Sequence, residues 1–194
     1  MSKDFPERFA SGTVVICGSA PSLLDEYEKV MDNRPDAKVM AINEAVSGVW
    51  ADYLISYHAE KFDYFKGISL NPNITSHTAK GYREELEEAQ IDYRWEGIKL
   101  GATSAGDAIQ IAKQMGFTEI ILVGCPMNGG DGYFNNTSLQ SDGCPRFGAP
   151  LADSNRDMVT NHKKGLMDLK QSSDFNMVWS MSGYSAEVFG KWRA

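Results

Sequence analysis

The stretch from Thr13 to Leu24 constrains the fold of this chain more than any other. It opens with the apolar, mostly β-branched run TVVIC, which is typical of a strand buried on both faces. Gly18 then permits a sharp turn, and Pro21 suits the first turn of a helix because its missing N–H would have no partner there. Such a strand–loop–helix junction points backbone amides and the positive end of a helix dipole at one spot. The stretch therefore predicts a phosphate seat or, as the alternative, an ordinary first βα turn of an α/β protein.

Strand-like and helix-like segments alternate along the rest of the chain. Short apolar runs predict further strands, at residues 37–42, 52–56, 119–124 and 176–181. Helices are predicted at residues 21–31, 61–65, 82–89, 160–172 and 183–190, and in the amphipathic stretch that Gly116 ends. Residues 71–77 are ambiguous between a loop and a short strand, and His77 is expected to be exposed there. The alternation predicts one α/β domain over residues 1–194, a Rossmann-like, doubly wound, mainly parallel sheet with helices on both faces.

Residues 125–159 predict a long active-site loop. They are rich in Gly, Asn, Asp, Pro and Ser and show no periodicity, and a connection of that length in a compact domain is usually functional. Tyr133 lies within this segment. Its ring is suited either to stacking on a base or sugar or to pinning the loop to the core, and both interpretations stay open.

Charge and cysteine content narrow the class of protein. The net charge of −7 argues against non-specific binding to nucleic acid, which needs a basic face, but it leaves room for a small anion held by backbone amides. No apolar run has membrane-spanning length, and the first residues are too polar for a signal peptide. Three cysteines without paired spacing fit a reducing compartment and no structural zinc. We therefore expect a cytoplasmic enzyme or binding protein with no membrane association, and the oligomeric state stays open.

Common nucleotide-binding fingerprints are absent. The dinucleotide motif needs three spaced glycines and an acidic residue after the next strand, whereas here Gly18 stands alone and the second strand ends in Asn43. No Gly-Lys-Ser/Thr sequence occurs, which argues against a P-loop.

A different family fits better. The segment Gly18-Ser19-Ala20-Pro21-Ser22-Leu23 resembles the Gly-x-Gly-Pro-Ser-Leu signature of the bacterial family-42 sialyltransferases. It is also similar to the related Rossmann-like hydroxymethylpterin diphosphokinases and flagellin motility-accessory proteins. Asn43, the ADYL run at 51–54, Thr103-Ser104 and the strand ending at Gly124 follow in the same order as in these families. Ser19 and Ala20 depart from the signature, and Cys125-Pro126 replaces the usual Ile-Asp pair, so an acidic contact is lost.

The resemblance implies a transferase that uses a nucleotide-activated donor, in particular a glycosyltransferase that moves a sugar to an acceptor hydroxyl. Nucleotide-binding residues are then expected at strand ends, at a helix start and in the long loop: Gly18, Ser19, Ala20, Pro21, Ser22, Asn43, Thr103, Ser104, Gly124 and Tyr133. For Asn43 the alternative is a turn residue, and for Thr103-Ser104 it is a helix cap.

Two histidines are candidates for the general base. His162 is placed at the start of the penultimate helix, where it resembles the sialyltransferase base, and His58 follows a strand directly. We expect no tightly bound cofactor and no metal, with the nucleotide or nucleotide sugar as a substrate. Mg²⁺ is required only under the alternative of a diphosphokinase. The third possibility is a non-catalytic nucleotide-binding protein, such as an accessory protein of the phage type.

Overall fold

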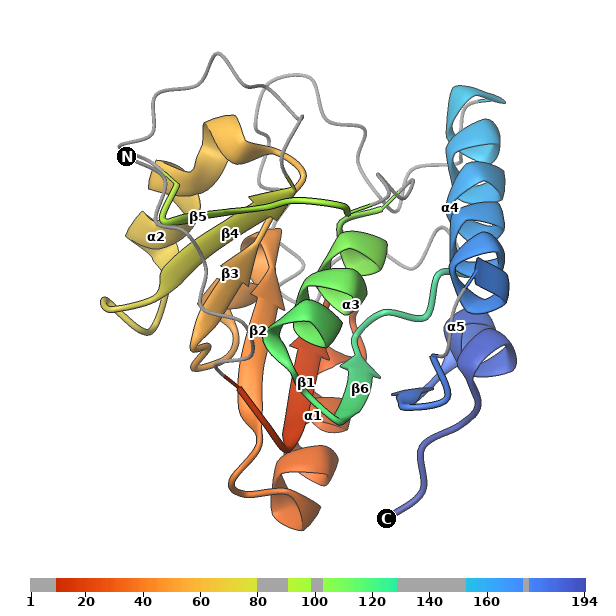
Figure 1. Cartoon of the computed structure of the whole chain (residues 1–194), viewed down its shortest axis with the longest axis horizontal. Helices are drawn as coiled ribbons and strands as arrows, with labels where there is room; N and C mark the ends of the chain where they lie inside the picture. Colours follow the sequence, from red (N-terminus) through yellow and green to blue (C-terminus); the bar gives the residue numbers. More distant parts are fainter. Residues whose placement is uncertain (1–9, 80–90, 99–102, 129–152, 173–174) are drawn as a thin grey trace.

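A computed structural model describes residues 10–79, 91–98, 103–128, 153–172 and 175–194 (Figure 1). Within these residues seven strands form one all-parallel sheet: β1 (Thr13–Cys17), β2 (Lys38–Ile42), β3 (Tyr53–Ile55), β4 (Thr75–Ala79), β5 (Tyr93–Trp95), β6 (Glu119–Val123) and β7 (Val178–Ser180). The strand order is β5-β4-β3-β2-β1-β6-β7. The chain moves outward from β1 to β5 and then crosses back to β6, so the topological switch point lies between β1 and β6.

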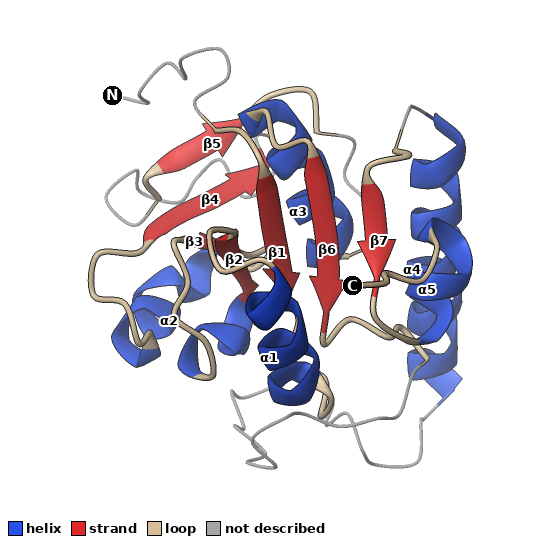
Figure 2. Cartoon of the chain, turned by 90° about the horizontal axis from the view of Figure 1, so that it is seen from below, coloured by secondary structure: helices blue, strands red, loops and turns tan. Residues whose placement is uncertain are grey.

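Helices cover both faces of this sheet. They are α1 (Leu23–Asn33), α2 (Phe62–Ile68), α3 (Ser104–Met115), α4 (Asp153–Ser172) and α5 (Gly183–Phe189), with short 3-10 turns η1 (Asn43–Ser47) and η2 (Ala59–Lys61). Side chains alternate along β1, so that Val14 and Ile16 pack with α3 while Val15 and Cys17 pack with α1 and α2. Figure 2 shows α1 and α3 on opposite sides of the strands. The α/β class and the Rossmann-like arrangement are thus confirmed.

Several boundaries differ from the sequence prediction. Helix α1 begins at Leu23, and Pro21 lies in the preceding turn instead of the first helical turn. Helix α4 begins at Asp153, so the last seven residues of the predicted loop at 125–159 are helical and His162 lies inside the helix. The rest of that loop from residue 129, with Tyr133, and the predicted helix at 82–89 lie outside the described residues.

The outer part of the sheet was the least predictable. Residues 75–79 form a strand, which resolves the ambiguity in favour of β4, and β5 was not predicted at all. The prediction that His77 is exposed is wrong, since its side chain is buried in β4. Its ring stacks on that of Tyr93, with ring centroids 4.9 Å apart, and is nearly perpendicular to that of Tyr53, with centroids 5.5 Å apart. A histidine can fill this position because both ring nitrogens find partners, Thr75 and Trp95.

No helix among the described residues combines the length and the apolar character needed to cross a membrane. The carboxyl ends of β1, β2, β3, β4 and β6 come to one edge of the sheet because all of these strands are parallel.

Candidate functional site

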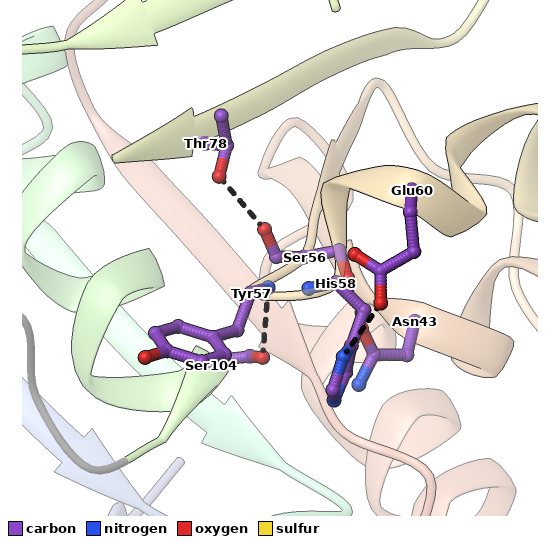
Figure 3. A network of polar contacts seen from close by, with 7 residues as sticks. All are labelled: Asn43, Ser56, Tyr57, His58, Glu60, Thr78 and Ser104. Carbon is purple, nitrogen blue, oxygen red and sulfur yellow. Dashed lines mark hydrogen bonds and ion pairs between the residues drawn. The ribbon is translucent and has the colours of Figure 1, made fainter. Parts of the chain in front are cut away.

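The register of β2, β3 and β4 aligns polar residues just beyond the paired strands. Ile42 pairs with Ile55, so the next residues, Asn43 and Ser56, become neighbours across the sheet edge. The Ser56 hydroxyl donates to Asn43 Oδ1 at 2.7 Å, and the Thr78 hydroxyl of β4 donates to the Ser56 carbonyl oxygen at 3.0 Å. Figure 3 shows these side chains meeting around Ser56.

Asn43 adopts an uncommon backbone conformation. Its φ is +52°, in the left-handed region, where asparagine is tolerated better than most residues with a side chain. This turn ends β2 and starts η1, and it directs the half-buried side chain toward Ser56. Asn43 is therefore both the turn residue of the alternative interpretation and a member of a polar cluster.

His58 belongs to the same cluster. Its backbone N–H donates to the Ser56 hydroxyl at 2.8 Å, and its Nδ1 lies 3.3 Å from Glu60 Oε1. The two side chains are 40% and 27% exposed, so solvent and ligand reach them. When Nδ1–H donates to the carboxylate, Nε2 is left as the basic nitrogen of the ring.

The start of α3 joins β3 at this point. Thr103 accepts the Gly106 amide N–H at 2.9 Å through its hydroxyl, which makes it the helix cap. Ser104 accepts the Tyr57 amide N–H at 3.1 Å, so this hydroxyl ties the helix to the end of β3. We define the Ser56 cluster as Asn43, Ser56, His58, Glu60 and Ser104. The positive end of the α3 dipole lies beside it.

In the loop after β1, where a phosphate was predicted to bind, two backbone amides already donate hydrogen bonds within the protein. The Gly18 amide donates to the Val123 carbonyl oxygen at 2.9 Å, and the Ala20 amide donates to that of Gly124 at 3.1 Å. The amides of Ser19 and Ser22, in the same loop, donate no hydrogen bond to a backbone carbonyl oxygen of any described residue. Only these two amides can face a ligand, because Pro21 has no N–H.

Two glycines meet at the switch point. A Cβ atom on Gly18 would stand 2.5 Å from both Cys125 Sγ and the Gly124 carbonyl oxygen, and one on Gly124 would stand 2.5 Å from the Gly18 carbonyl oxygen. The Gly124 amide donates to Glu26 Oε2 at 2.7 Å, and Glu26 is buried. The backbones of β1 and β6 thus pack directly together, and a carboxylate of α1 takes the amide that a phosphate would otherwise use.

His162 lies apart from the Ser56 cluster. It is a half-buried residue of α4, a helix that packs against α3 and α5, and burial lowers its pKa. No hydrogen bond or ion pair between described residues joins it to the cluster. Of the two predicted histidines, His58 is the one that the fold brings beside Asn43 and Ser104.

Three residues of this region, Ser56, Glu60 and Glu26, were not among the predicted site residues. Ser56 ends a predicted strand and Glu60 follows His58 by two residues, so both lay close to predicted site residues. Nothing in the sequence pointed to Glu26, because an acidic residue on a predicted helix is normally solvated.

Among the described residues, no three histidine, cysteine or acidic side chains gather closely enough to hold a metal ion.

Comparisons with protein-family models, with curated proteins and with solved structures found no match for this chain. The resemblance to sialyltransferase-like proteins therefore stays a prediction that depends on the short motifs alone.

Proposed function

We propose that this protein is a transferase that uses a nucleotide-activated donor, with His58 as its general base. The observation that supports this most is the His58–Glu60 pair, which stands next to Asn43 and Ser104 at the carboxyl edge of a parallel sheet. Ligands of such sheets bind at this edge. A histidine held by a carboxylate is a recurrent way to orient a base and to stabilise its protonated form.

The proposed reaction uses both members of the His58–Glu60 pair. His58 Nε2 takes the proton from an acceptor hydroxyl, whose oxygen forms a bond to the anomeric carbon of the donor sugar. The bond from that carbon to the nucleotide phosphate breaks, and the phosphate leaves with the electron pair. Glu60 stabilises the imidazolium that results. In this proposal the amides of Ser19 and Ser22, which make no backbone hydrogen bond to a described residue, and the start of α3 stabilise the developing charge on the phosphate.

The sugar in this proposal comes from the sequence resemblance, while the choice of His58 as the base is supported by its contact with Glu60. The first test is therefore a thermal-shift panel of nucleoside mono-, di- and triphosphates and nucleotide sugars, with and without a chelator, because a ligand of the native state raises Tm by mass action. Stabilisation that disappears with the chelator would instead favour the diphosphokinase alternative.

The second test separates the two histidines. For the nucleotide sugar that stabilises the protein, release of its nucleotide is measured for wild type and for His58→Gln, Glu60→Gln and His162→Gln. We expect His58→Gln to lose about 10²–10⁴ in rate, while nucleotide affinity is retained. Glu60→Gln should lose at least about tenfold, since a neutral amide stabilises the imidazolium poorly. Normal turnover in His58→Gln together with loss in His162→Gln would transfer the role to His162.

A further inference from the structure

The hydrogen bonds through Ser56 have a fixed direction. A backbone amide can only donate, so the contact at 2.8 Å makes Ser56 Oγ the acceptor of the His58 N–H. The single hydroxyl proton of Ser56 is then donated to Asn43, whose Oδ1 lies 2.7 Å away. Ser56 is only 1% exposed, so water offers this hydroxyl little alternative.

This direction fixes the orientation of the Asn43 carboxamide. If the carboxamide were reversed, its NH₂ group would face the hydroxyl, and the Ser56 proton would be buried with no acceptor, which is costly. Oδ1 is therefore used inside the protein. Asn43 Nδ2 makes no hydrogen bond to any residue that the structure describes, and the side chain is only half-buried. An asparagine that could in principle offer a donor and an acceptor thus has only its donor left for a ligand.

We propose that Asn43 Nδ2 donates a hydrogen bond to an acceptor atom of the ligand. Ser56 fixes the orientation of the carboxamide and thereby makes the site prefer an acceptor over a donor. In a nucleotide such an acceptor is a carbonyl oxygen or an unprotonated ring nitrogen of the base, a ribose oxygen or a phosphate oxygen. A ligand that places an N–H group at this point is disfavoured, because two donors face each other. This inference rests on the proposed nucleotide binding and adds to it the polarity of the contact.

The left-handed backbone at Asn43 supports this assignment. A φ of +52° costs free energy in any residue with a side chain, and it is retained only when the surroundings over-determine it. Here the buried Ser56 hydroxyl holds the side chain, and the next residues form η1. The same turn that ends β2 therefore holds the amide at the sheet edge in one orientation.

The test measures affinity by calorimetry with cytidine, uridine, adenosine and guanosine monophosphates as probes. Asn43→Asp keeps the acceptor for Ser56 but removes the outward donor, and Ser56→Ala releases the carboxamide to rotate. Ser47→Asp adds the same charge within η1 outside the Ser56 cluster, and Thr78→Val disturbs the end of β3 without touching Asn43. Tm is recorded for every variant.

For the tightest-binding monophosphate we expect at least a tenfold loss of affinity in Asn43→Asp and at least a threefold loss in Ser56→Ala. Ser47→Asp and Thr78→Val should stay within twofold of wild type, even where Tm falls as far as in Ser56→Ala. Unchanged affinity in Asn43→Asp would overturn the inference and leave nucleotide binding intact. Equal losses in Ser56→Ala and Thr78→Val would reduce Ser56 to a structural role and overturn the inference as well. Binding of no probe to the wild type would overturn both the inference and the proposed function.

Discussion

At the scale of single residues, the surroundings of Gly18 and His77 restrict which side chains these two positions tolerate. Gly18 lies against the Gly124 carbonyl oxygen and Cys125 Sγ, which leaves no room for a methyl group. His77 is buried, and its ring stacks on those of Tyr93 and Trp95. Each of these positions leads to a measurable consequence.

Gly18→Ala should destabilise the protein by about 1–3 kcal/mol, because the new Cβ overlaps backbone that cannot rotate away. The control is Gly67→Ala within α2, where a Cβ would meet nothing within 4 Å. That control should gain about 0.5–1 kcal/mol from helix propensity. Urea unfolding of the three proteins measures both effects. Equal stability of Gly18→Ala and wild type would show that the ends of β1 and β6 are not in direct contact.

Stability should fall with acidification because of His77. Burial lowers its pKa to about 3, so the unfolded chain takes up a proton below about pH 6.5 that the folded protein refuses until about pH 3. The free energy of unfolding is therefore full above pH 6.5 and declines by about 1.4 kcal/mol per pH unit below it. His162, whose pKa is lowered as well, adds a decline of the same sign.

The measurement is a series of urea titrations between pH 7.5 and pH 5 on wild type, His77→Gln and His162→Gln. His77→Gln should be less stable at pH 7.5 but show a much flatter pH dependence. If its slope equals that of the wild type, His77 is protonated in the folded protein and its assigned environment is wrong.

At the scale of elements, one carboxylate joins three pieces at the edge of the sheet. Asp92 precedes β5 and accepts both the amide and the hydroxyl of Ser76 in β4 at 2.8 Å, and it pairs with Lys66 of α2 at 2.9 Å. Burial raises the pKa of Asp92, but these hydrogen bonds outweigh burial, so the pKa lies below its usual value. A three-residue edge strand is thus fastened by side chains as well as by its ladder.

Asp92→Ala should lose about 1–2 kcal/mol of stability at pH 7, mainly because it removes the carboxylate that accepts from the Ser76 amide and hydroxyl. Since the pKa of Asp92 is depressed, this contribution is present above about pH 4 and disappears as the pH falls through the lower folded value. The exposed Asp36→Ala is the matched control and should change stability by less than about 0.5 kcal/mol. Chemical unfolding at pH 7 and pH 3.5 tests both statements. Identical behaviour of the two variants would contradict the assigned role.

At the scale of the whole molecule, the end of the described chain returns to the sheet. Trp192 is buried in the layer that holds α1, and the Arg34 guanidinium lies 5.7 Å from the centre of its ring. Arg34 also pairs with Glu119 at 3.0 Å, and Glu119 accepts the Thr13 hydroxyl at 2.6 Å. These contacts connect β1, α1, β6 and the segment after α5 at the edge opposite the Ser56 cluster.

Trp192→Ala should cost about 3–5 kcal/mol, the usual effect of deleting a buried tryptophan side chain. Trp50→Ala removes the same side chain from a position that is 60% exposed, and it should cost less than about 0.5 kcal/mol. Denaturant midpoints of the two variants provide the comparison. A small effect for Trp192→Ala would mean that the last residues are dispensable for the core.

The sequence predicted the strands that consist mainly of apolar residues, but it left β4 ambiguous and did not predict β5. β1 and β6 are continuous apolar runs, so both were predicted to within a residue. β4 contains Ser76 and His77, polar residues that are buried only because neighbouring side chains satisfy them, and β5 has no periodicity to detect. Helix α4 begins within a stretch whose composition favours a loop, so its first turns were not predicted.

The site was predictable in part for a similar reason. Asn43, His58 and Ser104 follow strand ends or open a helix, and a parallel sheet brings such positions to one edge. The role of Ser56 depends on the register between β2 and β3, which no local pattern contains. The sequence could not show that two amides of the Gly18 loop are used inside the fold, because their acceptors, Val123 and Gly124, lie about a hundred residues further along the chain.

The central place of β1 between β2 and β6 has a consequence for biosynthesis. Thr13 and Glu119 are partners in the sheet yet stand 106 positions apart in the chain. At about 5–20 residues per second, a ribosome needs roughly 5–20 s to make the residues between them. During that interval the edge of β1 that later pairs with β6 has no partner strand. Unpaired strand edges are sites where nascent chains aggregate or misassemble. We therefore expect a holdase chaperone to be most useful in the interval after β1 has been made and before β6 has been made, when this edge of β1 is unpaired.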